Sequence, residues 1–157
     1  MYGGLPVAIP LSVPLLASLQ LPFGVFWDVA TFTILVGMIF TRVGCLLNGC
    51  CAGRLTTTWV GIRLPNHLGV WEKRVPTQCL EAGWAAILLS SAIVVRPWLP
   101  FPGALLLIVA TGYAFGRLPL ESMREAEPSG NRFTIDHAIS TVVIVVSLAI
   151  LAVRWPT

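Results

Sequence analysis

Long apolar segments alternate with shorter polar ones along this chain, and the pattern predicts membrane-spanning helices. Five segments have a suitable length and composition: 4–20, 29–47, 79–95, 103–118 and 134–153. Each is close to the roughly 20 residues that a helix needs to cross a hydrocarbon core of about 30 Å. The first segment contains three prolines, which favours a kinked or short span. Residues 48–78 are more polar and are interrupted by glycine and proline, so we expect a loop outside the hydrocarbon.

The composition supports a single membrane domain. Hydrophobic residues make up 56% of the 157 positions and charged residues only 11%, less than half of the roughly 25% that is usual for soluble domains. The period-two alternation of a membrane barrel is absent from the sequence. We therefore predict an all-α fold, a polytopic transmembrane helical bundle of four to five spans in one domain, residues 1–157. The positive charges are scattered, which argues against a nucleic-acid partner.

One charged residue, Arg42, lies within the second predicted span. An arginine at the centre of a span costs at least ~2.5–3.5 kcal/mol on insertion scales, so function is its first explanation. A structural alternative stays open. Arg42 is five residues from the end of the span, from where its long side chain could extend to the membrane interface.

A second group of polar and charged residues begins inside the fourth predicted span and continues past its end. Tyr113, Arg117, Glu121 and Arg124 are spaced four, four and three residues apart, which places them on one helix face. Such a face can bind an anion while its own charges stay paired, and the structural alternative is a salt-bridge ladder at a helix end. With Arg42, the arginines outnumber the nearby acids. Because a guanidinium matches phosphate oxygens bidentately, the residues predict a site for an anionic phospholipid headgroup.

Three cysteines interrupt the apolar sequence in TRVGCLLNGCCAG, near the end of the second predicted span. Cys45, Cys50 and Cys51 either line a pocket or bind a metal ion with His67 as a fourth ligand. Adjacent cysteines on a helix point about 100° apart, so Cys50 and Cys51 converge only if the helix ends there. Gly49 makes such an ending feasible. On the residues alone, both interpretations stay open.

The chain resembles the bacterial prolipoprotein diacylglyceryl transferase family. The motifs that carry the resemblance occur in order: YGGL (2–5), RVGCLLNGCCAG (42–53), PTQCLE (76–81), YAFGRLPLESMR (113–124) and TIDHAIS (134–140). The family's arginine motif is G-R-x-G-N-F-x-N-x-E-x-x-G, and it is matched by Arg42, Gly44, Asn48 and Gly53. Cysteines replace its first asparagine and its glutamate, as in a divergent cysteine-containing branch. The resemblance implies that the cysteines line the substrate pocket.

The resemblance also implies a reaction. The family moves the diacylglyceryl group of phosphatidylglycerol onto the lipobox cysteine thiol of a prolipoprotein and releases glycerol 1-phosphate. The catalytic candidates are Arg42, Glu121, Arg117 and Tyr113; the phospholipid-binding ones are Arg42, Asn48, Arg117 and Arg124; the pocket-lining ones are Tyr2, Gly44, Cys45, Cys50, Cys51, Gln78, Glu81 and His137. Glu121 or Glu81 is the expected base for the acceptor thiol. No cofactor or metal is expected, and the expected partners are phosphatidylglycerol, the prolipoprotein signal peptide and membrane lipids.

The chain departs from the family at several positions. Tyr2 stands where the family's H-G-G motif begins with histidine, Val75 where a histidine often precedes the proline, and His137 where glutamine is usual. Other members have further helices before the first motif, so the sequence is expected to be either a truncated product or a reduced relative that needs a partner. A non-catalytic anionic-lipid-binding or accessory membrane protein derived from the family is the alternative function.

The expected location is the bacterial inner membrane, with the pocket and the 48–78 loop on the outer side, as the resemblance implies. That orientation leaves only Arg96 and Arg154 on the cytoplasmic side and four basic residues in the outer loop. The positive-inside rule predicts the reverse. We keep the family's orientation, because loop charges can serve anionic lipid.

Overall fold

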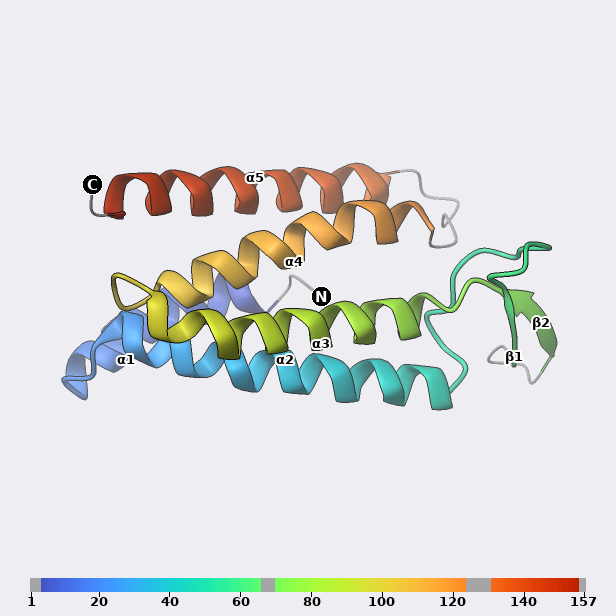
Figure 1. Ribbon diagram of the computed structural model, residues 1–157, viewed down its shortest axis with the longest axis horizontal. Coiled ribbons are helices and arrows are strands. Elements are labelled where there is room, and N and C mark those ends of the chain that lie inside the picture. Colours follow the sequence, from blue (N-terminus) through green and yellow to red (C-terminus); the bar gives the residue numbers. More distant parts are fainter. Residues whose placement is uncertain (1–3, 66–69, 124–130, 156–157) are drawn as a thin grey trace.

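The protein is a bundle of helices with a small β-hairpin at one end (Figure 1). The computed structural model describes residues 4–65, 70–123 and 131–155. Its helices are α1 (Leu5–Ser18), α2 (Phe23–Leu47), α3 (Thr77–Val95), α4 (Ala104–Ser122) and α5 (Asn131–Arg154), and a 3-10 turn, η1 (Arg96–Trp98), continues α3. The predicted all-α class is confirmed. The predicted bounds were too narrow at the start of α2, which begins at Phe23 and so extends beyond the charged residue Asp28, just after which the predicted span began.

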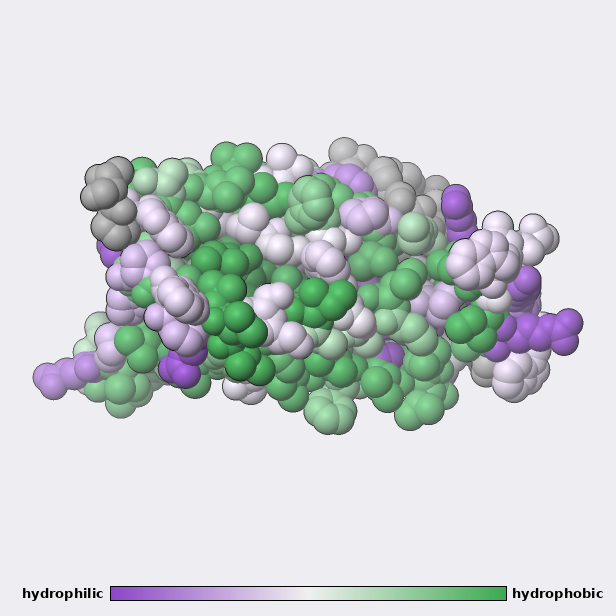
Figure 2. Space-filling model, in the orientation of Figure 1, coloured by the Kyte–Doolittle hydropathy of each residue, from purple (hydrophilic) through white to green (hydrophobic). Residues whose placement is uncertain are grey.

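Four segments within the described residues are long and apolar enough to cross a membrane: Phe23–Leu47, Thr77–Trp98, Ala104–Glu121 and His137–Arg154. The first predicted span is a helix too, but α1 has only 14 residues. At about 1.5 Å per residue it is roughly 21 Å long, which is short of a hydrocarbon core of about 30 Å. Figure 2 shows hydrophobic residues over the middle of the visible face and hydrophilic residues mostly towards its ends.

The hydrophobic core lies where α2, α3 and α4 pack together. Its buried members are Leu35, Leu88, Ala92, Leu105 and Val109. Trp84 of α3 packs directly on Gly116 of α4, where an added Cβ would collide with the indole ring. The same indole Nε1 donates a hydrogen bond to the Gly112 carbonyl at 3.2 Å. Small residues at a helix contact let backbones approach closely, which is how helices associate where water supplies no driving force.

Asp28 of α2 fixes the start of α4. Its carboxylate accepts hydrogen bonds from the backbone N–H groups of Gly103 at 2.7 Å and Leu106 at 3.2 Å. The first N–H groups of a helix have no partner inside that helix, and a carboxylate there also complements the helix dipole. Gly103 has a φ of 98°, in the left-handed region that favours glycine. An acidic side chain from a different helix therefore caps α4.

The segment predicted as a loop contains a two-stranded antiparallel sheet. Strand β1 (Ile62–Pro65) pairs with β2 (Trp71–Arg74), and Ile62 lies opposite Arg74. Each strand has four residues, so neither is long enough to give a clear alternating pattern in the sequence. The hairpin was not predicted for that reason.

Backbone hydrogen bonds tie this segment to the bundle. The Gly53 N–H donates to the Val75 carbonyl at 2.9 Å, and the Arg54 N–H donates to the Met123 carbonyl just after α4 at 3.1 Å. An added Cβ at Gly53 would lie 2.8 Å from that Met123 carbonyl oxygen. The end of α2, the start of α3 and the end of α4 are thereby held together at the hairpin end of the bundle (Figure 1).

Candidate functional site

Arg42 of α2 and Glu81 of α3 form an ion pair inside the bundle. Their side chains are 6% and 5% exposed. The alternative in which Arg42 extends to the membrane interface therefore does not hold, because its guanidinium turns inward to a carboxylate. A paired charge at membrane depth is far less costly than an isolated one.

Arg117 and Glu121 form a second ion pair, four residues apart on α4, with 2.9 Å between Nη2 and Oε2. The predicted salt-bridge contact thus exists, but the two side chains are only 4% and 15% exposed, so it is not a surface ladder. Tyr113, one turn earlier, is partly buried and packs against the hydrophobic core. Arg124, the last member of the predicted stripe, lies outside the described residues.

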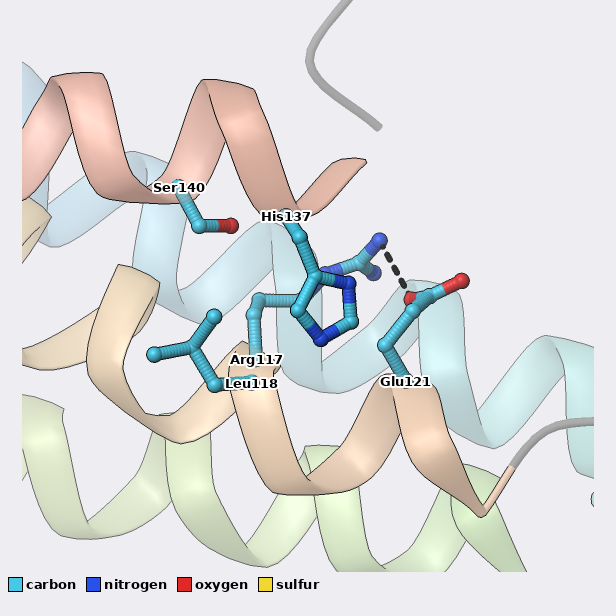
Figure 3. Close-up of a pocket in the computed structure, with 5 residues that line it drawn as sticks. All are labelled: Arg117, Leu118, Glu121, His137 and Ser140. Atoms are coloured by element: carbon cyan, nitrogen blue, oxygen red, sulfur yellow. Dashed lines mark ion pairs between the residues drawn. The ribbon is translucent and has the colours of Figure 1, made fainter. Parts of the chain in front are cut away.

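A small pocket adjoins the second pair, between α4 and α5. It is lined by Arg117, Leu118, Glu121, His137 and Ser140. Figure 3 shows the His137 ring extending from α5 towards the Arg117–Glu121 pair. The space between these side chains does not admit a water molecule, and pockets for drug-sized ligands have roughly 300–1,000 Å³, so a headgroup could bind here only if these side chains moved apart. The acyl chains of a phospholipid would have to remain along the outside of the helices.

Three arginines were expected to outnumber the nearby acids, and the structure describes two of them, Arg42 and Arg117. Each of them has a carboxylate partner. Glu81 is distant from Arg42 in the sequence, and only the packing of α3 on α2 brings the two together. A phosphate that enters this region must therefore bind the guanidinium N–H groups that face away from the carboxylate, or displace the carboxylate from the arginine.

The three predicted cysteines converge. Helix α2 ends at Leu47, and the chain then reverses through Gly49 and Cys51, whose φ angles are 66° and 62°. As a result, the Sγ atoms of Cys45, Cys50 and Cys51 all lie within 4.8 Å of one another. The condition for convergence, that the helix ends before the cysteine pair, is met. The fourth ligand considered from the sequence, His67, lies outside the described residues.

The first residues of α3 hold this turn in place. Gln78 Nε2 donates to the Cys50 carbonyl at 2.7 Å, and Thr77 Oγ1 donates to the Cys51 carbonyl at 3.0 Å. Both donors come from side chains that are at most 2% exposed. Gln78, predicted to line the pocket, is thus hydrogen-bonded to the cysteine turn.

The Cys50 thiol lies in a polar setting just outside the spans. Burial raises the pKa of this thiol, but hydrogen bonds from Cys45, Cys51 and Asn48 together outweigh that effect and leave the pKa below its ordinary value. Asn48, predicted to bind phospholipid, is in this structure a neighbour of Cys50. The thiolate is the form of cysteine that binds metals and reacts.

Gly44, predicted to line the pocket, is not brought to either ion pair. Gly44 is exposed on α2, and an added Cβ there would meet no atom within 4 Å, because two residues along a helix turn it about 200° away from Arg42. Tyr2 lies outside the described residues. Conversely, sequence reasoning missed Ser140, which is 2% exposed and lines the small pocket. Its spacing of three from His137 was the available signal.

Comparison with known proteins identifies the family. The sequence model of prolipoprotein diacylglyceryl transferase matches residues 1–153. Curated relatives named phosphatidylglycerol–prolipoprotein diacylglyceryl transferase include that of Agrobacterium fabrum, 29% identical over 167 residues that cover 99% of this chain and 59% of the relative. That of Dehalococcoides mccartyi is 34% identical over 104 residues, or 64% of this chain and 40% of the relative. That of Helicobacter hepaticus is 27% identical over 129 residues, or 82% and 44%.

The chain therefore spans between 40% and 59% of the length of these relatives. No solved structure matches it. The family match nevertheless extends over nearly all of the sequence, and it includes both arginines of the buried ion pairs and the cysteine turn. The chain belongs to the prolipoprotein diacylglyceryl transferase family.

Proposed function

We propose that this protein transfers the diacylglyceryl group of phosphatidylglycerol to the lipobox cysteine thiol of a prolipoprotein. The observation that carries the proposal is the pair of buried Arg–Glu contacts, Arg42–Glu81 and Arg117–Glu121, in the helices of a membrane bundle whose sequence belongs to this family. We further propose that the protein lies in the bacterial inner membrane, with the hairpin end of the bundle on the outer side.

The arginines provide the phosphate-binding part of the reaction. A guanidinium presents a planar fork of donors that matches two phosphate oxygens. In surroundings that exclude water, such donors stabilise the charge that develops on the leaving phosphate. Arg117 lines the small pocket beside α5, and Arg42 is held in one orientation by Glu81. Each carboxylate keeps its arginine oriented before substrate arrives.

The acceptor thiol supplies the nucleophile. Its sulfur attacks the glycerol carbon that carries the phosphate, a C–S bond forms, and the C–O bond to the phosphate breaks. Glycerol phosphate leaves with the electron pair. The thiol proton passes to a base, for which Glu121 is our choice because it adjoins the pocket together with His137. When Arg117 turns towards the phosphate, the Glu121 carboxylate leaves its ion pair and can accept the thiol proton.

One observation favours a second function. Arg42 and Arg117 each already have a carboxylate partner. The region around them therefore carries less net positive charge than a phosphate-transfer site would be expected to have. This charge balance fits an accessory protein that binds anionic lipid without transferring its diacylglyceryl group. The two functions differ in whether a covalent product forms.

The test is a transfer assay with the full chain in nanodiscs that contain phosphatidylglycerol. A fluorescent peptide with a lipobox is added, and mass spectrometry measures the diacylglyceryl adduct, with the same peptide carrying serine in place of the cysteine as control. Adduct on the cysteine peptide alone supports the proposal. Binding of phosphatidylglycerol with no adduct from folded protein would instead establish the accessory function.

A further inference from the structure

The cysteine turn has the geometry of a metal-binding site. Three sulfur ligands within 4.8 Å of one another come from the last turn of α2 and the reversal that follows it. With metal–sulfur bonds of about 2.3 Å, tetrahedral zinc places its sulfur ligands roughly 3.8 Å apart. The three thiols would therefore need to move by less than about 1 Å to bind one ion together.

The backbone of the turn is held for this arrangement. Cys51 has a φ of 62°, a strained conformation that is uncommon for a residue other than glycine. It is maintained by the buried donors Thr77 and Gln78, which bond the Cys51 and Cys50 carbonyls. Metal ligands are commonly oriented in this way by a surrounding shell of hydrogen bonds.

A second observation concerns Gln78. Its side-chain Oε1 is buried and has no hydrogen-bond partner among the described residues, although its Nε2 is bonded to Cys50. A buried polar atom without a partner usually indicates a ligand, ion or water that completes the site. The unpaired oxygen belongs to the residue that holds the cysteine turn.

Among the described residues, the cluster offers three ligands of the kinds that bind metal ions. Cys51 is exposed, so one side of the cluster is open to an incoming ligand. Three protein ligands and an open fourth position characterise catalytic zinc sites, whereas structural zinc sites have four protein ligands. Zinc also converts a coordinating thiol to the thiolate outright.

We propose that Cys45, Cys50 and Cys51 bind one Zn²⁺ ion whose fourth position takes the acceptor thiol of the substrate. This inference rests on the proposed transfer function. The acceptor thiol gives its proton to Glu121, the base proposed above, and binds zinc as a thiolate; its sulfur then attacks the lipid carbon, and glycerol phosphate leaves with the electrons of the broken C–O bond. The thioether product carries no charge and dissociates from the zinc.

The position of Arg42 supports this assignment. It precedes Cys45 by three residues on α2, so the two side chains occupy neighbouring positions on one helix face. A guanidinium for the phosphate and a metal for the thiol thus lie within one helical turn. Both halves of the proposed reaction are provided for at the same end of α2.

The experiment uses the full chain purified in detergent under reducing conditions. Zinc per chain is measured by mass spectrometry, and Co²⁺ replaces zinc to give the charge-transfer and d–d absorption of tetrahedral thiolate coordination. We expect about one metal ion per chain, and a change of the Co²⁺ spectrum with the lipobox peptide but not with its serine version. Cys50→Ala and Cys51→Ser should lose the metal, Gln78→Leu should weaken binding about 10–100-fold, and Cys79→Ala, outside the cluster, should bind normally.

The outcomes separate this inference from the proposed function. A Co²⁺ spectrum that responds to the peptide, without diacylglyceryl transfer, would support the metal site and contradict the transferase. Full transfer by folded protein stripped of metal would support the transferase and overturn the metal site. Equal zinc content in wild type and Cys51→Ser would show adventitious binding and overturn the metal site too. A disulfide within the turn that persists under the reducing conditions of the purification would also overturn it.

Discussion

Removing one partner of the Arg42–Glu81 pair should destabilise the bundle strongly. In Glu81→Gln the Arg42 guanidinium keeps its charge and its burial, with 6% of its side chain exposed, but loses its counter-charge. Breaking a buried pair in this way costs about 3–5 kcal/mol, or a factor of about 10²–10⁴ in the ratio of folded to unfolded protein. The double variant Arg42→Met with Glu81→Leu leaves no buried charge. It should recover most of that stability, because apolar replacement of a buried pair is often neutral.

The assay is equilibrium unfolding in mixed micelles with increasing sodium dodecyl sulfate, followed by circular dichroism. Glu72→Gln is the matched control. It removes the same charge from the hairpin pair Glu72–Arg74, whose side chains are 31% and 14% exposed, and breaking a pair that is partly open to water should cost less than breaking the buried one. The assay resolves differences of about 1 kcal/mol in the free energy of unfolding. If the values for Glu81→Gln and Glu72→Gln differ by less than that, the Arg42–Glu81 pair is solvated and the reasoning fails.

Three further predictions concern packing and chemistry. Asp28→Ala should lower the free energy of unfolding by about 1–3 kcal/mol in the same assay, since two helix N–H groups lose their acceptor, whereas Asp28→Asn should retain part of that contribution. Gly116→Ala should cost about 1–3 kcal/mol through overpacking, while Gly83→Ala, where an added Cβ meets no atom within 4 Å, should be neutral or slightly stabilising; equal effects would exclude tight packing at Gly116. Glu121→Gln should reduce transfer about 10²–10⁴-fold if it is the base, and the hairpin variant Glu72→Gln should transfer normally.

Much of the fold could be predicted from hydrophobicity alone. Four of the five predicted spans correspond to long apolar helices, because a membrane span needs length and low charge and both are visible in the sequence. The length of α1 was harder, since its prolines are tolerated within the helix and do not mark its ends. The hairpin strands Ile62–Pro65 and Trp71–Arg74 are each too short to produce a pattern.

Local spacing predicted one part of the candidate site, and tertiary packing decided the rest. The Arg117–Glu121 contact follows from a separation of four residues on a helix. The Arg42–Glu81 contact depends on how α3 packs against α2, which no spacing encodes. Convergence of the cysteines required the positive φ angles at Gly49 and Cys51. Of those two residues, only the glycine is a type that indicates such a turn in a sequence.

The most direct test of the central claim is diacylglyceryl transfer by Arg42→Lys compared with wild type, in protein shown to be inserted and monodisperse. The account predicts transfer by wild type and a loss of about 10²–10³-fold in the lysine variant, because an ammonium keeps the charge but not the bidentate fork that holds the phosphate. Near-normal transfer by Arg42→Lys would contradict that role for Arg42, and would mean that its buried charge serves the fold alone.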